Sequence, residues 1–336
     1  MANANTSNLA DIIKTMYEKR LLTRAVGRMV YGKWPLRARL NGFGTLEWRR
    51  YGALSAVTNT LTEGTNPAEQ AAPTPTLITS TPSWYGAWVE WTHKMELTVF
   101  DDYLSELSGI LGEQAALSAD VLIRNVLTDG ATKDYSGGVS GRTSLAAGTH
   151  DISYIDIVKV IAALETNNAR PMAGGWKMII HPHTYSSLMQ DPVFVNMFTQ
   201  ETNDSAIRSG KMGRILNCEI YISSNARKYV DGGAVVGSAT SDVYSAVILG
   251  EEAYGTVGFA GLDPEVVDSG AAEGENLTGR KDLKPVELIM KPRGSSGSED
   301  PLDMRGTVGW KMAFEAKVLN SDFIIDLEHT NAHSLE

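Results

Sequence analysis

Two histidines that stand two residues apart are the strongest candidates for chemistry in this sequence. His181 and His183 lie in the stretch HPHTY, where they could offer two nitrogen ligands to a metal ion. No third histidine, cysteine or acid stands at a recognisable spacing, and the HxxxH pattern of a helical metal site is absent. We therefore interpret the stretch as a turn from a strand into a helix, capped by His183 or Thr184. A metal-dependent hydrolase remains only a remote alternative.

The other chemically suggestive residues match no catalytic motif. Asp101 and Asp102 are adjacent, so on a helix their carboxylates point in different directions, and capping of the helix start is the better interpretation. SGGVSGRTS lacks the spacing of a phosphate loop, GTVGFAG does not fit GxGxxG, and no GxSxG occurs. The single cysteine, Cys218, excludes an internal disulfide and is interpreted as a small apolar filler, and His93 as a strand residue. The sequence thus predicts no enzyme, no cofactor and no metal site.

Charge is distributed very unevenly along the chain. The 336 residues carry a net charge of −10, but residues 1–50 hold ten basic and three acidic side chains and are +7. The remainder is therefore −17, and such an arm is expected to lie on something negative, either nucleic acid or the acidic body of another copy. The sequence contains no apolar run of about 18 residues and no signal peptide, which argues against a membrane partner.

A long and nearly uncharged segment poses the main structural question. From Tyr51 to Ser83 the only charged residues are Glu63 and Glu69, and threonines alternate on both sides of the breaker-rich stretch EGTNPAEQAAP. Alternation favours strands, so the segment is predicted to be one long two-stranded hairpin with an irregular tip. An isolated hairpin is marginal in water, so this one needs another surface on which to lie.

The elements that must hold this hairpin follow from periodicity. Residues 6–31 are predicted to be helical, WPLRARLNGFGT extended, and residues 101–127 a helix about 40 Å long. Three tryptophans, Trp84, Trp88 and Trp91, are interpreted as core packing at the base of the hairpin, with an aromatic binding platform as the alternative. A mixed α/β region follows, with a helix in SYIDIVKVIAALETN and buried strands in WKMII, EIYIS and VYSAVILG. Residues 259–284 are predicted to be loop, and GWKMAFEAKVL alternates as a half-exposed antiparallel strand.

The order of these parts resembles the major capsid proteins of tailed bacteriophages, which have the Hong Kong ninety-seven type fold. The individual sequence motifs are most similar to those of the branch typified by coliphage N-four. The resemblance is carried by YEKRLLTRA, LTEGTNP, YGAWVEWTHKMELT, LSGILGEQAALSADVLIRNVL, IIHPHTYSSL, LGEEAYG and MKPRGSSGSEDPLDMRGTVGWKMAFEAKVLN. These stretches run from about residue 17 to about residue 320, so the resemblance covers nearly the whole chain.

The resemblance implies an α+β fold with five parts. These are an N-terminal arm (1–47), an extended hairpin called the E-loop with its base (48–95), a peripheral domain with a long spine helix (96–140), an axial α/β domain (141–284), and a return to the peripheral domain with closing strands (285–336). It also implies inter-subunit contacts. Those in the E-loop are expected at Thr58, Thr60, Glu63, Asn66, Pro67, Thr76 and Ile78. Those in the N-terminal arm are expected at Arg20, Arg24, Arg28, Arg37 and Arg39.

The implied function is structural: self-assembly, through hexamers and pentamers, into the icosahedral head that encloses the double-stranded DNA of a tailed phage. The expected location is the virion, assembled in the host bacterial cytoplasm. The resemblance allows for separate scaffolding, portal and decoration proteins and for non-specific DNA contact. An encapsulin-like nanocompartment shell is the alternative. Some relatives crosslink subunits through an E-loop lysine, but no lysine stands between Lys33 and Lys94, so that link is not expected here. Because the sequence begins directly at the arm, any scaffold is expected to be separate or already absent.

Overall fold

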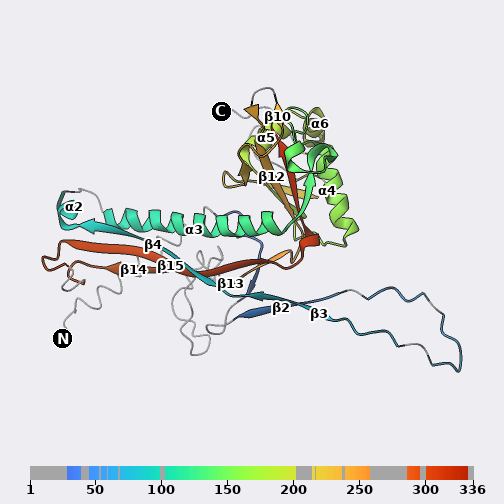
Figure 1. Ribbon diagram of the computed structural model, residues 1–336, viewed down its shortest axis with the longest axis horizontal. Helices are drawn as coiled ribbons and strands as arrows, with labels where there is room; N and C mark the ends of the chain where they lie inside the picture. The colour runs from blue at the N-terminus through green and yellow to red at the C-terminus, as the bar shows by residue number, and fades with distance from the viewer. Residues whose placement is uncertain are drawn as a thin grey trace.

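The computed structural model of the chain describes residues 29–38, 45–52, 54–58, 60–66, 69–98, 103–201, 214–215, 217–236, 239–257, 286–295 and 300–331. Within these ranges the protein has three parts (Figure 1). A long helix, α3 (Tyr103–Gly130), runs along a first sheet, an α/β lobe stands at one end of this helix, and a hairpin extends away from both. Beyond its base, the hairpin projects away from the other described parts of the chain (Figure 1).

Helix α3 supplies the long axis of the molecule. Its 28 residues correspond to about 42 Å. Leu107, Leu111, Ala115, Ile123 and Leu127 are all buried and recur at intervals of four or eight residues, because one helical face packs on the first sheet. The helix predicted for residues 101–127 is confirmed over the described part, and its end lies three residues later, at Gly130. Asp101 and Asp102, the predicted cap, lie outside the described residues.

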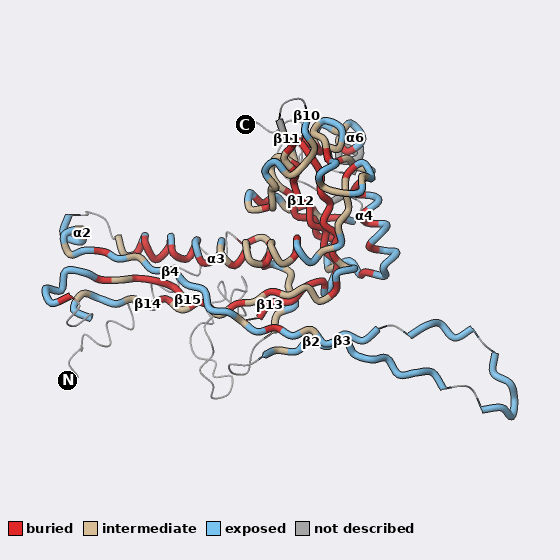
Figure 2. Tube along the Cα trace, viewed as in Figure 1, coloured by how far each residue is buried: buried red, intermediate tan, exposed pale blue. Residues whose placement is uncertain are grey.

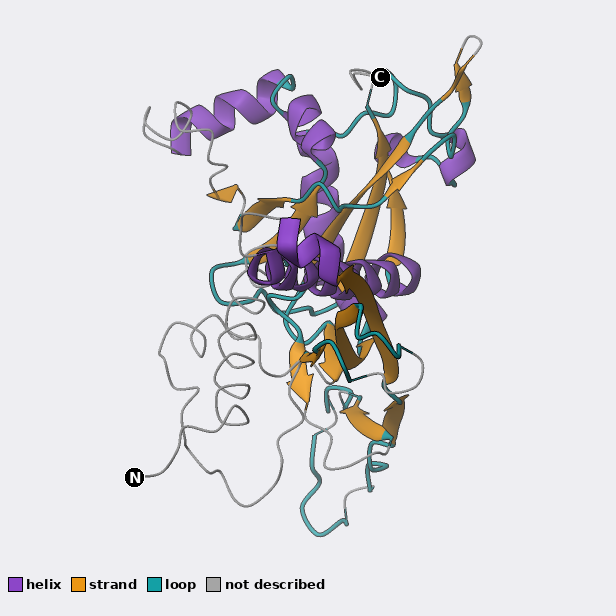
Figure 3. Ribbon diagram, turned by 90° about the vertical axis from the view of Figure 1, so that its left-hand side faces the viewer, coloured by secondary structure: helices purple, strands orange, loops and turns teal. Residues whose placement is uncertain are grey.

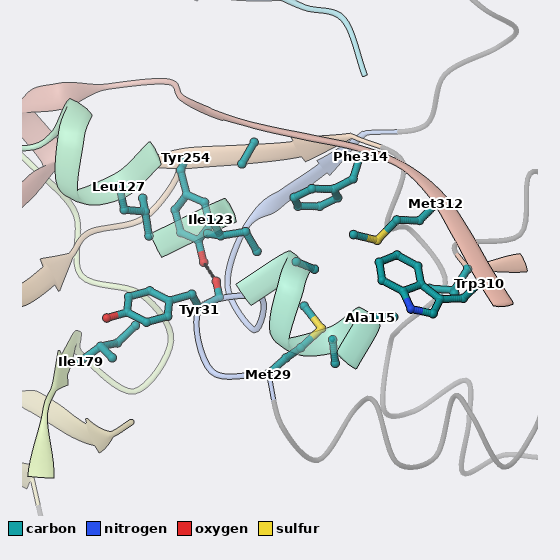
Figure 4. Close-up of a cluster of buried hydrophobic side chains, with 14 of the residues drawn as sticks. Met29, Tyr31, Ala115, Ile123, Leu127, Ile179, Tyr254, Trp310, Met312 and Phe314 are labelled. Carbon is teal, nitrogen blue, oxygen red and sulfur yellow. Dashed lines mark hydrogen bonds between the residues drawn. The ribbon is translucent and has the colours of Figure 1, made fainter. Parts of the chain in front are cut away.

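The first sheet is organised around β15 (Arg305–Val318). On one side β15 pairs with β4 (Ser83–Thr92), and on the other with β14 (Glu287–Lys291) and β13 (Tyr254–Val257), all antiparallel. A short strand, β1 (Leu36–Ala38), adds to β13 in parallel. The alternation predicted for GWKMAFEAKVL is confirmed, because its apolar positions are buried while the charged positions between them are half-buried. The buried set is Trp310, Met312, Phe314 and Ala316, and Figure 4 shows the first three pointing from β15 toward Ala115 and Ile123.

Strand β4 ends one residue earlier than its sequence pattern predicts. Thr92 is its last residue, and His93 begins a short helix, α2 (His93–Thr98), so the prediction of His93 as a strand residue is wrong. The backbone N–H of Met95 donates to the Thr92 hydroxyl at 3.4 Å, which is the arrangement of a helix N-cap. The capping threonine therefore outweighs the β-preference of the preceding residues.

The α/β lobe contains a sheet that is described as seven strands. Its order is β5-β16-β12-β6-β8-β7, with β9 also paired to β12. The strands predicted in WKMII, EIYIS and VYSAVILG are confirmed as β6, β8 and β12, and β6 and β12 are buried along their whole length. The helix predicted from Ser153 is confirmed as α4, with Ser153 and Asp156 forming a reciprocal capping box. The bounds in this lobe are β5 (Thr132–Tyr135), α4 (Tyr154–Thr166), β6 (Trp176–Ile180), α5 (Pro182–Leu188), α6 (Pro192–Glu201), β7 (Arg214–Ile215), β8 (Cys218–Ile222), β9 (Lys228–Tyr229), β12 (Val243–Leu249) and β16 (Ile324–Thr330), with a two-stranded hairpin of β10 (Val235–Val236) and β11 (Ala239–Thr240).

The last strand joins the lobe and not the first sheet. β16 pairs with β12 and, in parallel, with β5. The sequence-based division assigns β5 and β16 to the peripheral domain, whereas both strands pair within the sheet of the α/β lobe. The reason is that β16 is apolar on the side of α4, where Ile325 and Leu327 join the core of the lobe, and its partner β12 lies far away in sequence.

The hairpin has strands only at its base. β2 (Leu46–Tyr51) and β3 (Pro75–Ser80) pair from Leu46–Ser80 to Tyr51–Pro75. The described residues between Gly52 and Thr74 have no strand, so the prediction of strands through Thr58, Thr60 and Thr62 is wrong. A paired ribbon exposed on both faces gains too little apolar burial to persist alone. The base is supported because Ser80 donates a 2.9 Å hydrogen bond to Glu315 on β15.

The chain before β1 is turned, not helical. Met29, Val30 and Tyr31 were predicted to lie in the helix of residues 6–31, but the structure has them in a bend and turn that runs into the core. Residues 6–28 of that prediction lie outside the described residues, as do residues 259–284 of the predicted loop. Figure 4 shows Tyr31 beside Tyr254, Ile123 and Leu127, where its side chain is fully buried. Figure 3 shows helix α3 and the two sheets viewed from one end of the molecule.

Candidate assembly surfaces

The histidine pair belongs to a packed aromatic cluster. His181, and not His183 or Thr184 as predicted, is the N-cap of α5, because its ring nitrogen accepts the backbone N–H of His183 at 3.1 Å. His183 Nδ1 lies 2.9 Å from the Tyr244 hydroxyl. Burial lowers the pKa of His181 to about 4, with the neighbouring His183 and Lys228 adding to the effect. Among the residues that the structure describes, no group of three histidine, cysteine or acidic side chains could hold a metal.

Cys218 is confirmed as a core residue. Its side chain is buried in the α/β lobe, and burial raises the pKa of its thiol to about 12, which leaves it unreactive.

The buried charges of the lobe are held in a closed network. Asp326 and Glu328 on β16 have no exposed surface. Lys133 binds both, at 2.5 Å and 3.1 Å, and Arg142 donates two hydrogen bonds of 2.6 Å to Glu328. These cations hold the pKa of Glu328 below its usual value against the opposing effect of burial. Because each carboxylate is engaged and shielded from solvent, the network braces β16 against β5 and offers no access to a substrate.

The hairpin arm is the first candidate surface. It consists of β2, β3 and the described residues between them, and Figure 2 shows it exposed along nearly its whole length, projecting from the buried core. Of the predicted contact residues, Thr58, Thr60, Glu63 and Asn66 are exposed and lie outside any strand. Thr76 is exposed and Ile78 half-buried on β3, while Pro67 lies outside the described residues.

The sequence pattern did not single out the apolar side chains of this arm. Leu54, Val57 and Leu61 are 55%, 74% and 81% exposed, and Tyr51 and Leu77 at its base are also largely exposed. Exposed apolar side chains of this size gathered on one projection mark a surface for association. The signal for these side chains in the sequence is the presence of Leu54, Val57 and Leu61 within a threonine-rich and nearly uncharged segment.

The open face of the first sheet is the second candidate surface. We define it as the side of β4 and β15 opposite α3, with Trp84 and Trp88 on β4 and Gly309, Lys311 and Ala313 on β15. Trp84 is 52% and Trp88 66% exposed, whereas Trp91, on the face toward α3, is 5% exposed. The prediction of core packing therefore holds for Trp91 and is wrong for the other two. The reason is the period of two: positions 84 and 88 fall on the opposite face from 91.

Of the arginines predicted for the N-terminal arm, only Arg37 lies among the described residues. It is on β1 and donates a 3.4 Å hydrogen bond to the Gly32 carbonyl. Arg20, Arg24, Arg28 and Arg39 lie outside the described residues. Within the described ranges, no helix has the length and hydropathy of a membrane span.

Comparison with known proteins gives a consistent result. Residues 75–320 match the family model described as phage capsid protein. The fold is similar to the capsid of cyanophage P-SCSP1u (TM-score 0.62, 15% identity, covering 90% of this chain and 88% of the other) and to the capsid of Ralstonia phage GP4 (TM-score 0.62, 14% identity, 90% and 88%). It is also similar to the capsid of cyanophage Pam1 (TM-score 0.61, 11% identity, 93% and 93%). No match was found among curated proteins.

Proposed function

The chain belongs to the phage capsid protein family and is a phage major capsid protein; we propose that it self-assembles into the icosahedral head that encloses double-stranded DNA. The observation that carries this proposal is a pair of surfaces that expose large apolar side chains on one chain. The outer part of the hairpin arm exposes the apolar side chains of Leu54, Val57 and Leu61, and the open face of the first sheet presents two largely exposed tryptophans. Two different surfaces on identical chains permit heterologous contact, which is what a closed shell requires.

The parts of the chain take the following roles in the proposal. The hairpin arm acts as the E-loop and lies on a neighbouring subunit, where its backbone gains hydrogen bonds that the free arm lacks. Helix α3 is the spine of the peripheral domain, and the α/β lobe is the axial domain that meets its copies in hexamers and pentamers. In this proposal the fold is of the Hong Kong ninety-seven type. The sequence motifs support membership of the branch typified by coliphage N-four.

The partners follow from charge and family. The basic arm, including Arg20, Arg24 and Arg28, neutralises the acidic bodies of neighbouring subunits, and the acidic body keeps packaged DNA from adhering to the wall. Separate scaffolding, portal and decoration proteins would complete the head, which would be assembled in the bacterial cytoplasm. No catalytic step is part of this proposal.

Electron microscopy of the purified full-length chain, with a scaffolding protein if one is required, tests the proposal. We expect closed shells of uniform size. A chain that stays monomeric under every assembly condition would sink the idea. Shells isolated from the natural source should contain nucleic acid, whereas an enclosed protein enzyme in place of nucleic acid would support the encapsulin alternative.

A matched pair of variants tests the open face. Trp88→Ala should leave the stability of the free subunit nearly unchanged, because the side chain is mostly exposed, but should reduce the yield of shells. Trp91→Ala removes a buried indole and should cost about 3–5 kcal/mol of unfolding free energy, measured by denaturant titration. Normal shell yield from Trp88→Ala would exclude the open face as an assembly contact.

A further inference from the structure

One buried carboxylate holds three separate segments of the chain together. Asp120 lies in the middle of α3 and is 1% exposed. It accepts the backbone N–H of Val30 at 2.9 Å, the N–H of Tyr31 at 2.7 Å, and the side-chain amide of Asn225 at 2.9 Å. A carboxylate that accepts several N–H groups away from water makes strong, oriented contacts. Asp120 therefore joins the root of the N-terminal chain, the spine helix and the loop after β8.

The next two turns of α3 continue the connection to the α/β lobe. Arg124 donates to the backbone carbonyl of Asn225 at 2.9 Å and to its side-chain oxygen at 3.2 Å. Arg227 donates to Thr128 and to Asp129, both at 2.7 Å. Positions 120, 124 and 128 are four residues apart, so they form one polar stripe that faces the segment from Ser223 to Arg227. The lobe is thus attached to the helix through directed bonds and not through apolar packing alone.

The other side of the root is also fixed. The carbonyl of Tyr31 accepts a 2.5 Å hydrogen bond from the Tyr254 hydroxyl on β13, drawn as a dashed line in Figure 4. Residues that follow Tyr31 lead through β1 into the base of the hairpin arm. The segment at Val30–Tyr31 is therefore the root of the basic arm on one side and of the hairpin arm on the other.

We propose that Asp120 is a positioning residue that couples the root of both arms to the orientation of the α/β lobe. A neighbour that engages either arm pulls on Val30 and Tyr31, and Asp120 transmits the displacement to Asn225 because the same carboxylate holds both. The lobe then takes the angle to α3 that the shell requires. For its assembly readout this inference rests on the proposed function.

An exchange of side chains tests the coupling. Asp120→Asn places an amide against the Asn225 amide, so two donors meet. Asn225→Asp places two carboxylates together. The double variant D120N/N225D restores one donor and one acceptor, and Arg124 keeps an acceptor at position 225. In unassembled subunits, we expect each single variant to raise amide hydrogen exchange at Tyr31 and at 223–225 together, at least about tenfold, and the double variant to recover most of the protection.

The same three variants are then examined for shell formation. The single variants should give shells of altered or mixed diameter by electron microscopy, and the double variant should restore uniform shells. Ser118→Ala, on the same helix but outside the junction, is the control and should match the unmodified protein, because the Ser118 hydroxyl donates to the Gln114 carbonyl of its own helix. Faster exchange at only one of the two segments, or no rescue by the exchange of side chains, would overturn the coupling. Failure of the unmodified chain to form shells would refute the proposed function and leave the exchange result to decide the coupling alone.

Discussion

Several tryptophans of this protein lie over glycines of the neighbouring element. A Cβ atom on Gly306 would stand 2.5 Å from the Trp91 ring, and one on Gly255 would stand 2.8 Å from the Trp48 ring. On the open face, Trp88 approaches Gly309 in the same way, with 2.7 Å between such a Cβ and the Trp88 Cβ. Glycine removes the side chain that the indole would strike, so these pairs set how closely β4 and β15, and the hairpin base and β13, come together.

We predict that Gly306→Ala destabilises the subunit by about 1–3 kcal/mol, because the new methyl group must displace the buried indole of Trp91. Urea titration followed by tryptophan fluorescence measures the change. Gly52→Ala is the matched control, since no atom lies within 4 Å of its added Cβ, and its effect should stay within about 0.5 kcal/mol. Equal midpoints for both variants would contradict the close contact.

We also predict that a buried histidine makes the subunit less stable as the pH falls below neutrality. Burial lowers the pKa of His329 from 6.5 to about 4. Between these values the unfolded chain binds a proton that the folded chain does not, so unfolding free energy falls as pH falls. At pH 5.5, one unit below the unfolded value, His329 alone should account for about 1.4 kcal/mol relative to high pH.

Denaturant midpoints at pH 7.5 and pH 5.5 measure this effect. His329→Asn should be less stable at both values, because the 2.8 Å contact with Thr184 changes, but its midpoint should vary less with pH. An unmodified protein with the same midpoint at both values would rule out a buried neutral imidazole at position 329.

At the level of elements, the hairpin arm and the first sheet both present apolar side chains that could contact another subunit. The arm has strands only where the body supports it, at β2 and β3, and its outer residues are exposed. β4 carries apolar side chains on both faces, but α3 covers only one of them. The hairpin arm and the sheet thus each expose large apolar side chains among the described residues.

Deletion of residues 63–72 should therefore separate folding from assembly. These residues lie beyond the strands of the hairpin and, where described, make no contact with either core, so the subunit should unfold at nearly the same denaturant concentration as the full chain. Shell formation should be severely reduced, because the shortened arm no longer reaches a neighbour. Light scattering and electron microscopy give the result, and normal shells from the deletion would refute the role of the arm.

For the whole molecule, charge and shape point to assembly with copies of itself. A +7 segment precedes a body of −17, and the first sheet is connected to the α/β lobe by α3 and by polar bonds around Asp120. The hairpin arm extends outward from the body (Figure 1). A body with an extended arm suits a shell in which each chain contacts several neighbours.

Salt should accordingly weaken the contacts of the basic arm. We expect assembled shells to release subunits more readily as ionic strength rises from about 0.1 M to about 1 M, where the screening length falls from roughly 10 Å to roughly 3 Å. Reversal of Arg20 and Arg24 to glutamate should reduce assembly and remove part of the salt dependence. Shells that are indifferent to salt would contradict a mainly electrostatic arm.

Regular elements with a strong period could be predicted from the sequence alone. The helix after Ser153, the body of α3 and the alternation of β15 each depend on local spacing of apolar residues, and the structure confirms them. The low charge of the hairpin can be read directly from its composition. Its predicted need for another surface follows as well, because the segment has too few large apolar residues to form a core of its own. The function was predicted from the family resemblance, because no residue pattern in the sequence matched a catalytic motif.

Other features were decided by tertiary contacts. Which face of β4 became core depends on where α3 lies, so Trp91 is buried while Trp84 and Trp88 are exposed, although all three are the same residue type. The junction at Asp120 joins residues about 90 and 105 positions apart, and no local pattern could reveal it. Strand alternation along the hairpin was likewise insufficient, because alternation becomes a paired strand only where a second surface supports it. The sequence determined which segments prefer which local structure, and only packing across the chain determined which of their faces were covered and which stayed available to another subunit.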